Sequence, residues 1–531
     1  MEFAVAILSK LLFASGFVGP NWTTNYGGDA TLRANCLALT SSLSIENTTI
    51  LDASYLPAPS TIRTSGTCRS TATHTAPLCR VRFHTNTSAT SGIDAEAWLP
   101  DEWYGRFMGI GNQGMQGCIL YDDLDHGSAL HFATVGSNNG HDGDTALPFF
   151  HNPDVLYDFS VRAIHAEAVV GKQIVEAYYG RPPAYSYYTG CSTGGRQGTQ
   201  AALKHPDDFD GILAGSPAID FNHLVHWTGM VSRHLGAPAA ASPSFIPLES
   251  WKIIAKEVLR QCDALDGVAD GVITDPDSCV FRPESLLCSG EDSSRRSCFT
   301  APQVEALRKI YSPLYGPAGE LLYSRFDPGA ESSPLIWFLL SGKFPPYTEQ
   351  WLKYVVLNVT DYNIGDYGAK HGALFDSVNG GDIATFNGDF SAFRDRGGKF
   401  LSYHGRADPA CPSINYIPVQ VIPSGNSKRL YDLISRTLSM PTLDTFYRLF
   451  LVPGMDHCTG GAGAFKFGQA PGTHAVNSSS HDIILALVDW VENNVAPDTI
   501  IGTASDGATR VHCRYPIQSR WNGSAFRCEA S

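Results

Sequence analysis

The sequence feature that most restricts the possible folds is a glycine-flanked serine in Gly190-Cys-Ser-Thr-Gly194. Residues 185–188 before it are typical of a strand, and the residues after it, to about Lys204, are typical of a helix. The glycines permit a sharp turn that exposes the Ser192 hydroxyl at the amino end of the helix, where the backbone N–H of Thr193 would face an oxyanion. The same pattern also occurs by chance in ordinary glycine-rich turns, so the flanking strand and helix carry the interpretation.

Strands and helices alternate along most of the chain, with one long interruption. Predicted strands cover residues 95–99, 106–110, 131–135, 399–403 and 447–451, and predicted helices cover residues 155–179 and 483–491. Such alternation favours a mostly parallel sheet with helices on both faces. The aromatic-rich stretch between about residues 220 and 395 lacks this alternation, and we interpret it as an inserted lid.

Together these observations predict an α/β fold, specifically an α/β-hydrolase fold with a large inserted lid domain. Residues 17–219 would form the N-terminal part of the catalytic domain, residues 220–395 the lid segment, and residues 396–531 the C-terminal part. Residues 17 to about 90 are rich in Thr, Ser and Asn and contain three cysteines. We expect a loop-rich, disulfide-tied region there.

A serine becomes a strong nucleophile only when a base takes its proton, and the chain offers 17 histidines. His457 is the best candidate, because it lies in a loop between the last predicted strand of the sheet and the last predicted helix. His404 precedes the acid position, which breaks the usual order of serine, acid and histidine, and is better interpreted as a packed histidine at a strand end. Asp408 is the candidate acid that orients His457. Asp456 adjoins the histidine in sequence and is a poor orienter.

Two cysteines stand directly beside these candidates. Cys191 precedes Ser192, and Cys458 follows His457. A disulfide between them would hold the nucleophile and the base side by side. Alternatively, each cysteine pairs elsewhere, or one stays buried as a free thiol.

Charge and cysteine usage narrow the class of protein. The formal net charge is −14, without a basic run, which argues against a nucleic-acid partner. Residues 1–16 are a short apolar stretch ending in small residues, an imperfect signal peptide too short to span a bilayer. No later segment is typical of a membrane span. The chain has 13 cysteines and six N-x-Ser/Thr sequons, so we expect a secreted, disulfide-bonded glycoprotein. The sequon asparagines are Asn21, Asn47, Asn86, Asn358, Asn477 and Asn522.

An acidic, glycine-containing loop within the lid segment suggests a second site. Asp263, Asp266 and Asp270 lie close together in sequence, and the carbonyl groups of Val268 and Val272 would add further oxygen ligands. Oxygen-rich loops of this kind suit Ca²⁺. The spacing is not that of an EF-hand. The alternative is a solvated acidic turn. Metal catalysis is not expected, because the loop contains no histidine and the chain has no H-E-x-x-H motif.

Several longer segments resemble the tannase and feruloyl esterase family, most closely its fungal type B feruloyl esterases. The resemblance runs through most of the chain after about residue 36. It rests on Ala95-Glu-Ala-Trp-Leu-Pro100, Gly140-His-Asp-Gly-Asp-Thr145, Tyr187-Tyr-Thr-Gly-Cys-Ser-Thr-Gly-Gly-Arg-Gln-Gly198, Pro206-Asp-Asp-Phe-Asp-Gly211, Phe393-Arg-Asp-Arg-Gly-Gly-Lys399 and Val488-Asp-Trp-Val-Glu-Asn493.

The resemblance implies a Cys-Ser pair, an Asp and a His-Cys pair, which here are Cys191-Ser192, Asp408 and His457-Cys458. It implies a structural calcium ion held in the lid by Asp263, Asp266, Val268, Asp270 and Val272. It also implies six disulfides, Cys36–Cys79, Cys68–Cys118, Cys191–Cys458, Cys262–Cys279, Cys288–Cys298 and Cys513–Cys528, which leave Cys411 unpaired.

Two further details follow from this resemblance. The glycine-rich turn at residues 111–117 would supply the second oxyanion donor, for which Gly114 is the candidate, although Gln113 stands where the family usually has glycine. Some tannases are cut at a dibasic site in the lid, so cleavage after Arg296 is a hypothesis. The alternative there is an exposed basic loop.

The expected activity is two-step hydrolysis of a carboxylic ester. The resemblance favours a plant phenolic ester, namely a hydroxycinnamoyl ester, with a gallate ester and hence a tannase as the alternative. Four lid aromatics, Trp227, Trp337, Tyr347 and Trp351, would either pack the phenolic ring or form the core of the lid. A secreted calcium-dependent binding protein without activity is an alternative of a different class, and the intact candidate triad argues against it. The sequence does not indicate an oligomeric state.

Overall fold

The computed structural model describes residues 29–239, 241–289, 298–333, 339–408, 421–474 and 476–529. Five of the sequence predictions fall outside these ranges. They concern the signal peptide at residues 1–16, the sequon at Asn21, the cleavage site after Arg296, the aromatic Trp337 and the unpaired Cys411.

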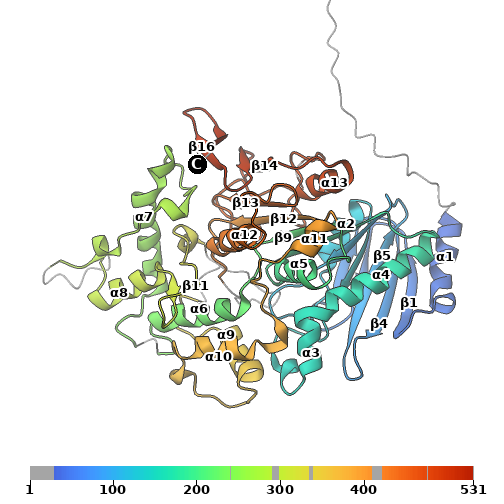
Figure 1. Cartoon of the computed structure of the whole chain (residues 1–531), viewed down its shortest axis with the longest axis horizontal. Helices are drawn as coiled ribbons and strands as arrows, with labels where there is room; N and C mark the ends of the chain where they lie inside the picture. The colour runs from blue at the N-terminus through green and yellow to red at the C-terminus, as the bar shows by residue number, and fades with distance from the viewer. Residues whose placement is uncertain are drawn as a thin grey trace, which may run out of the picture.

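A nine-stranded sheet forms the centre of the catalytic part (Figure 1). Its strands are β1 (Thr48–Leu56), β4 (Leu78–Asn86), β5 (Gly92–Pro100), β6 (Arg106–Ile110), β7 (Phe132–Ser137), β8 (Tyr185–Cys191), β9 (Gly211–Gly215), β12 (Lys399–Gly405) and β13 (Tyr447–Val452). They lie in the order β1-β4-β5-β7-β6-β8-β9-β12-β13. Along this order, each strand from β1 through β4 and β5 to β7 is antiparallel to the next one. Each strand from β7 through β6, β8, β9 and β12 to β13 is parallel to the next one. The predicted α/β class with a mostly parallel central sheet is confirmed.

Helices cover both faces of the sheet, which explains why the side chains of its central strands are mostly buried. One face packs into a hydrophobic cluster with α1 (Asp29–Ser42), α4 (Ala163–Tyr179), α5 (Thr193–Lys204), α11 (Ser391–Asp395) and α12 (Gly425–Thr437). The other face packs against α2 (Tyr121–Ala129) and α13 (Ile483–Asn493). All five residues of β9 are buried as a result.

The predicted helix at residues 155–179 is one continuous helical segment in the structure. It consists of α3 (Pro153–Tyr157), a π-helical turn at Asp158–Arg162, and α4. It ends at Gly180, whose φ of 73° is the left-handed conformation that glycine adopts most readily.

The prediction of a loop-rich region up to about residue 90 is wrong for residues 29–86. Helix α1 and strands β1, β2 (Ser60–Arg63), β3 (Thr71–His74) and β4 occupy most of it. Strand β1 is an edge strand with a mostly half-exposed surface, so its threonines and serine face solvent and hide the hydrophobic alternation. The prediction that disulfides tie this region is confirmed, because Cys36 bonds to Cys79.

The lid segment leaves the sheet after β9 and returns at β12. These two strands are direct neighbours, with Leu213 opposite Leu401, so the whole lid segment is an insertion between adjacent strands. Figure 1 shows its helices beside one end of the sheet. Its elements are α6 (Phe221–His234), α7 (Trp251–Cys262), α8 (Ala301–Ile310), β10 (Leu314–Tyr315), β11 (Leu321–Tyr323), α9 (Pro346–Gln350) and α10 (His371–Val378), followed by α11.

Three of the four lid aromatics are buried in a hydrophobic core that the lid segment shares with residues of the catalytic part, such as Phe149 and Phe159. Trp227, Tyr347 and Trp351 are all buried in one hydrophobic cluster. The ring of Trp351 packs edge-on to Phe221, with the ring centroids 4.9 Å apart. The structure therefore assigns these side chains to the lid core, which was the alternative to packing a phenolic ring.

Two small hairpins complete the chain, formed by β14 (Thr499–Thr503) with β15 (Thr509–Cys513) and by β16 (Gln518–Trp521) with β17 (Phe526–Glu529). All six disulfides that the family resemblance implies are present. Among the helices of the described residues, none is both long enough and apolar enough to cross a bilayer.

Candidate active site

Ser192 occupies a strained turn between β8 and α5. Its φ is 62° and its ψ is −119°, a conformation that side chains other than glycine rarely adopt. The backbone N–H of Ser192 donates to Gly215 on β9 at 2.9 Å, which fixes the turn to the neighbouring strand. Gly190 and Gly194 face each other across the turn, and a Cβ on Gly190 would lie 2.8 Å from the Gly194 backbone. The two glycines of the motif therefore permit the close approach that the turn requires.

His457 and Asp408 meet at the carboxyl ends of β13 and β12. The Nδ1 atom of His457 lies 2.8 Å from one carboxylate oxygen of Asp408 and 3.0 Å from the other. Both side chains are fully buried. The two loops are also joined through their backbones, since the N–H of Ala407 donates to the carbonyl of Met455 at 3.0 Å. The Nε2 atom of His457 is buried and has no hydrogen-bond partner among the described residues.

The electrostatic surroundings keep Asp408 ionised. Burial alone would raise the pKa of this carboxyl, but the charge of His457 and hydrogen bonds from His457 and His404 outweigh it and lower the pKa. An ionised Asp408 accepts the Nδ1–H of His457, which leaves the lone pair on Nε2.

Neither rival occupies a position suited to catalysis. His404 is fully buried, its Nδ1 lies 2.7 Å from the Ser427 hydroxyl, and its Nε2 lies 3.3 Å from Asp408. It is therefore a packed histidine at a strand end, and it supports the acid. Asp456 accepts a hydrogen bond from the Ser333 hydroxyl at 3.1 Å, and burial raises its pKa to about 6.

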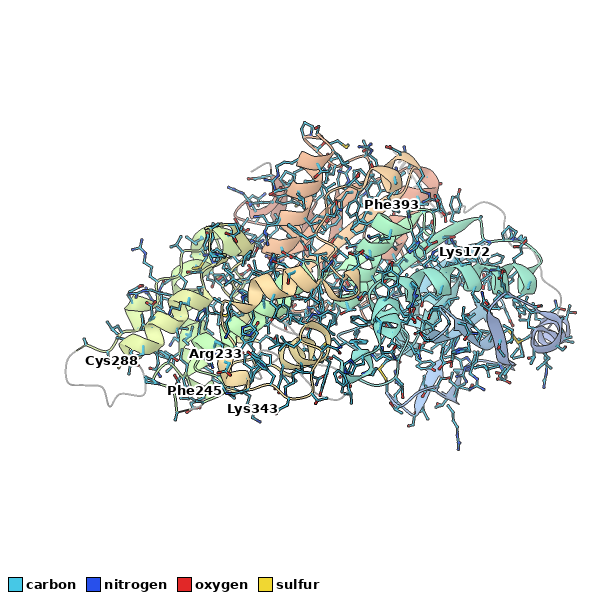
Figure 2. All side chains as sticks on the ribbon, turned by 60° about the horizontal axis from the view of Figure 1, so that its bottom comes forward. Lys172, Arg233, Phe245, Cys288, Lys343 and Phe393 are labelled. Atoms are coloured by element: carbon cyan, nitrogen blue, oxygen red, sulfur yellow. A yellow bond between two sulfur atoms is a disulfide. The ribbon has the colours of Figure 1, made fainter. Side chains whose placement is uncertain are left out.

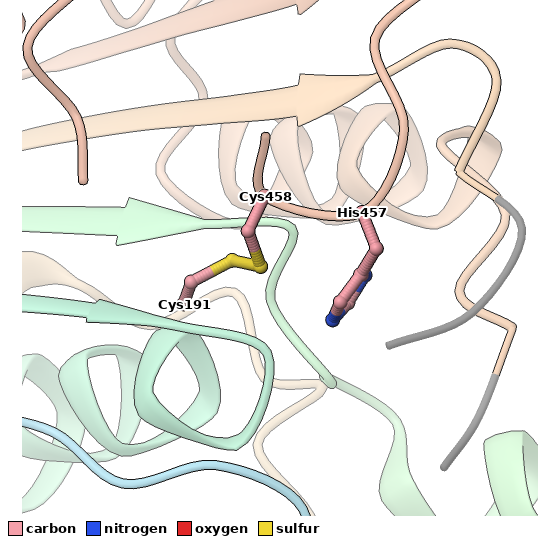
Figure 3. A group of neighbouring side chains, drawn as sticks. All are labelled: Cys191, His457 and Cys458. Carbon is pink, nitrogen blue, oxygen red and sulfur yellow. A yellow bond between two sulfur atoms is a disulfide. The ribbon is translucent and has the colours of Figure 1, made fainter. Parts of the chain in front are cut away.

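A disulfide connects the two halves of the site. Cys191, the last residue of β8, bonds to Cys458, although 267 positions separate them in the sequence. Figure 3 shows this bond beside the His457 ring. Because each cysteine adjoins a candidate catalytic residue, the bond limits how far Ser192 and His457 can separate.

The two residues that carry the candidate oxyanion donors are in contact. The hydroxyl of Thr193 donates to the carbonyl of Gly114 at 2.6 Å, so the glycine-rich turn contacts the start of α5. Within the described ranges, neither the Thr193 amide nor the Gly114 amide has a hydrogen-bond acceptor. Gly114 has a φ of 53°, and a Cβ there would lie 2.7 Å from the Tyr347 hydroxyl.

Sequence reasoning missed the side chains that hold this turn in place. Gln197, on α5, accepts the backbone N–H of Asn112 at 2.9 Å and donates to the side chains of Asn112 and Asn139, each at 3.0 Å. All three side chains are buried. No local sequence signal identifies such a network, because its members come from three separate loops and helices.

The acidic loop of the lid segment has a donor set that fits a hard cation. Each of its three aspartates accepts a backbone N–H from within the loop, Asp263 from Gly271, Asp266 from Val268 and Asp270 from Val272. Burial raises the pKa of Asp270, and the charges of Asp266 and Asp263 add to this effect. Carboxylate oxygens are the ligands that Ca²⁺ prefers, although the oxygens of these three aspartates do not all lie within 4.8 Å of one another in this structure. The Cys262–Cys279 disulfide closes the loop.

An ion-pair chain links this loop to the candidate acid. Arg406 is buried two residues before Asp408, and its guanidinium contacts Asp275 at 2.6 Å and Asp277 at 2.9 Å. Both aspartates follow the acidic loop directly. The loop and the catalytic end of β12 are therefore in contact through one side chain.

Comparisons with known proteins identify the family of the chain. The family model described as "Tannase and feruloyl esterase" matches residues 79–531. "Probable feruloyl esterase B-2" of Aspergillus flavus is 43% identical over 459 residues, which cover 84% of this chain and 85% of that protein.

Two solved structures are similar to the chain over nearly its whole length. Feruloyl esterase B from Aspergillus oryzae superposes with a TM-score of 0.88 and 36% identity, covering 94% of this chain and 100% of that one. Tannin acyl hydrolase from Aspergillus niger has the same fold, with a TM-score of 0.70 and 20% identity, covering 94% and 96%. An inactive binding protein is no longer a suitable interpretation. By sequence and by fold, this chain belongs to the tannase and feruloyl esterase family of carboxylic ester hydrolases.

Proposed function

We propose that the protein is a secreted feruloyl esterase that hydrolyses hydroxycinnamoyl esters of plant cell-wall polysaccharides. Ser192 is the nucleophile, His457 the general base and Asp408 the residue that orients it. The observation that carries this proposal is the buried, unpartnered Nε2 of His457, held by Asp408 on one side and tethered to the Ser192 turn by the Cys191–Cys458 disulfide.

The reaction proceeds by two acyl transfers. His457 Nε2 takes the Ser192 hydroxyl proton as the oxygen attacks the ester carbonyl, and the imidazolium then gives this proton to the departing alcohol. Water, deprotonated by the same nitrogen, releases the acid from the acyl-enzyme and restores the serine. The amides of Thr193 and Gly114 donate to the oxyanion in both steps. The Gln197 side chain keeps the Asn112 turn, and with it Gly114, at a fixed distance from α5.

The choice of a hydroxycinnamoyl ester rests on the similar proteins. Those at 36–43% identity are named feruloyl esterase B, whereas the tannin acyl hydrolase is only 20% identical. The alternative substrate is a gallate ester, because the family description includes both activities. Residues 220–395 act as the lid that selects between them. Tyr347 is the lid aromatic that lies against Gly114.

Secretion is supported by the surface as well as by the disulfides. All five sequon asparagines within the described residues are exposed, so an oligosaccharide could be attached at each without disturbing the core. They are Asn47, Asn86, Asn358, Asn477 and Asn522.

The acidic loop holds Ca²⁺ through Asp263, Asp266 and Asp270, with the carbonyl groups of Val268 and Val272 as further ligands. A bound ion would neutralise the charge of the loop, and no step of the ester hydrolysis uses it. The contact of Arg406 with Asp275 would link the loop to the segment after β12 that carries Asp408. Chelation of Ca²⁺ should lower the Tm of the wild type, whereas an Asp270→Asn variant should already show the lower Tm and respond little to chelator. An equal response of both proteins would contradict this assignment.

The decisive experiment compares hydrolysis of methyl ferulate and methyl gallate. We expect turnover of methyl ferulate by the wild type and a loss of about 10⁴–10⁶-fold in the Ser192→Ala variant. Ser186→Ala, a change of another buried serine on β8, is the matched control and should retain activity. Turnover of gallate alone would move the assignment to tannase. Full ferulate turnover by Ser192→Ala would disprove the serine mechanism.

A further inference from the structure

A second cluster of metal-ligating side chains lies away from the active site. His165 on α4, His205 directly after α5 and Asp208 in the following loop place one ligand atom each within 4.8 Å of one another. His165 Nδ1 lies 2.8 Å from an Asp208 carboxylate oxygen. The rings of His165 and His205 are stacked, with centroids 3.9 Å apart and planes 12° apart.

The donor set of this cluster differs from that of the acidic lid loop. Two imidazole nitrogens and one carboxylate oxygen suit Zn²⁺ and similar transition-metal ions, whereas Ca²⁺ prefers oxygen ligands alone. Among the described residues, a further group of neighbouring metal-ligating types, Cys191, His457 and Cys458, lacks free thiolates because its two sulfurs are bonded to each other.

The cluster is accessible and partly arranged in advance. The side chain of His165 is 41% exposed and that of Asp208 only 8% exposed, so an ion can reach the histidine while the carboxylate stays fixed. The backbone N–H of Asp208 donates to the carbonyl of His205 at 3.0 Å. Lys172, labelled in Figure 2, donates from the same helix as His165 to the carbonyl of Asp208.

A small cavity lies beside the two histidines. Its volume is about 10 Å³, and its lining includes His165 and His205 but not Asp208. Three protein ligands leave one place of the tetrahedral shell that Zn²⁺ prefers, which a water molecule can take.

We propose that His165, His205 and Asp208 bind a divalent transition-metal ion, with Zn²⁺ as the reference ion. Metal binding requires the stacked imidazole rings to reorient until one nitrogen of each faces the ion beside the Asp208 carboxylate. The site joins α4 to the carboxyl end of α5. Because α5 has 12 residues and begins at Thr193, the ion lies about 18 Å along the helix from the nucleophile and has a structural role.

The test measures Zn²⁺ binding to the full chain by titration calorimetry, with excess Ca²⁺ present to fill the acidic loop. We expect the wild type to bind one Zn²⁺ at this site, Zn²⁺ to raise its Tm, and Co²⁺ in its place to give the visible absorption of a tetrahedral complex. His205→Gln and Asp208→Asn keep side-chain size and should each weaken Zn²⁺ binding by at least about tenfold.

His474→Gln is the matched control, because His474 also pairs with an aspartate at 2.8 Å and is 37% exposed, but it belongs to no such cluster among the described residues. It should bind Zn²⁺ as the wild type does. The proposal is overturned if the wild type binds no Zn²⁺, if His205→Gln and Asp208→Asn bind it with unchanged affinity, or if only the His474 variant loses binding. Ester hydrolysis is not a readout here, so failure of this proposal leaves the proposed function untouched.

Discussion

His457, in the loop after β13, and His474, in the segment before α13, make the same kind of hydrogen bond to an aspartate. His457 Nδ1 lies 2.8 Å from Asp408, and His474 Nδ1 lies 2.8 Å from Asp482. In the first pair both side chains are fully buried, whereas His474 is 37% exposed. Asp482 accepts the backbone N–H of Leu485 and thereby caps α13. A histidine–aspartate hydrogen bond is therefore not specific for catalysis in this protein.

Three features separate the two regions. His457 has a buried Nε2 without a partner among the described residues. Its partner Asp408 also contacts a second histidine, His404, and a disulfide joins the His457 loop to the Ser192 turn. The opposite pKa shifts of the aspartates reflect this difference. The pKa of Asp408 is lowered because two histidines outweigh burial, and the pKa of Asp482 is raised because burial outweighs Leu485 and His474.

Replacing the histidines gives the largest expected contrast. His457→Gln removes the base and should lower kcat on methyl ferulate by about 10⁵–10⁶-fold, while His474→Gln should leave kcat within about twofold. Steady-state kinetics of the two purified variants measures this. Comparable losses in both would mean that the two pairs have been assigned the wrong roles.

Replacing the aspartates should give a smaller but still large contrast. Asp408→Asn no longer fixes the Nδ1–H tautomer of His457, and kcat should fall by about 10⁴-fold. Asp482→Asn retains an acceptor for the Leu485 amide and should remain active. If Asp408→Asn keeps wild-type kcat, another group orients His457.

Removing the tether tests the third feature. The double variant Cys191→Ala/Cys458→Ala should lose about 10- to 100-fold in kcat, because small displacements of the reacting groups are costly. It should also lose up to about 5 kcal/mol of stability, because the bond closes a long loop. Cys513→Ala/Cys528→Ala, which opens a bond of the C-terminal hairpins, is the control and should keep its kcat. Equal kcat in both double variants would show that the tether is dispensable for catalysis.

The smallest effect is a difference in how stability depends on pH. Because folding lowers the pKa of Asp408 from its ordinary value of 3.8, ionised Asp408 stabilises the folded protein above pH 3.8. This stabilisation is lost as the pH falls through the folded-state pKa. Because folding raises the pKa of Asp482 from its ordinary value of 3.8, protonated Asp482 stabilises the folded protein below pH 3.8. This stabilisation is lost as the pH rises through the folded-state pKa.

Urea unfolding between about pH 2.5 and 5.5 checks this pair of signs. The stability advantage of the wild type over Asp408→Asn should grow with pH, and its advantage over Asp482→Asn should shrink. Parallel pH profiles for the two variants would contradict the opposite shifts.

Much of the catalytic part could be predicted from sequence because its signals are local. The strand and helix around Ser192 have clear periodicity, and the glycines at 190 and 194 mark the turn between them. Strand β1 was missed because an edge strand with one solvated face carries threonine where a central strand carries valine. The roles of Gln197 and Arg406 depend on contacts with residues remote in sequence, such as Asn112 and Asp275, and no periodicity encodes those contacts.

The Cys191–Cys458 bond also determines what a break in the chain does. Residues 192–457, which include the entire lid segment and Asp408, lie within one covalent ring closed by this bond. A single peptide-bond cut anywhere in that ring leaves the two fragments in one covalent molecule. Ser192 and His457 then still adjoin the disulfide that joins the fragments. Cleavage in the lid, such as the hypothesised cut after Arg296, thus frees two new chain ends without releasing a fragment.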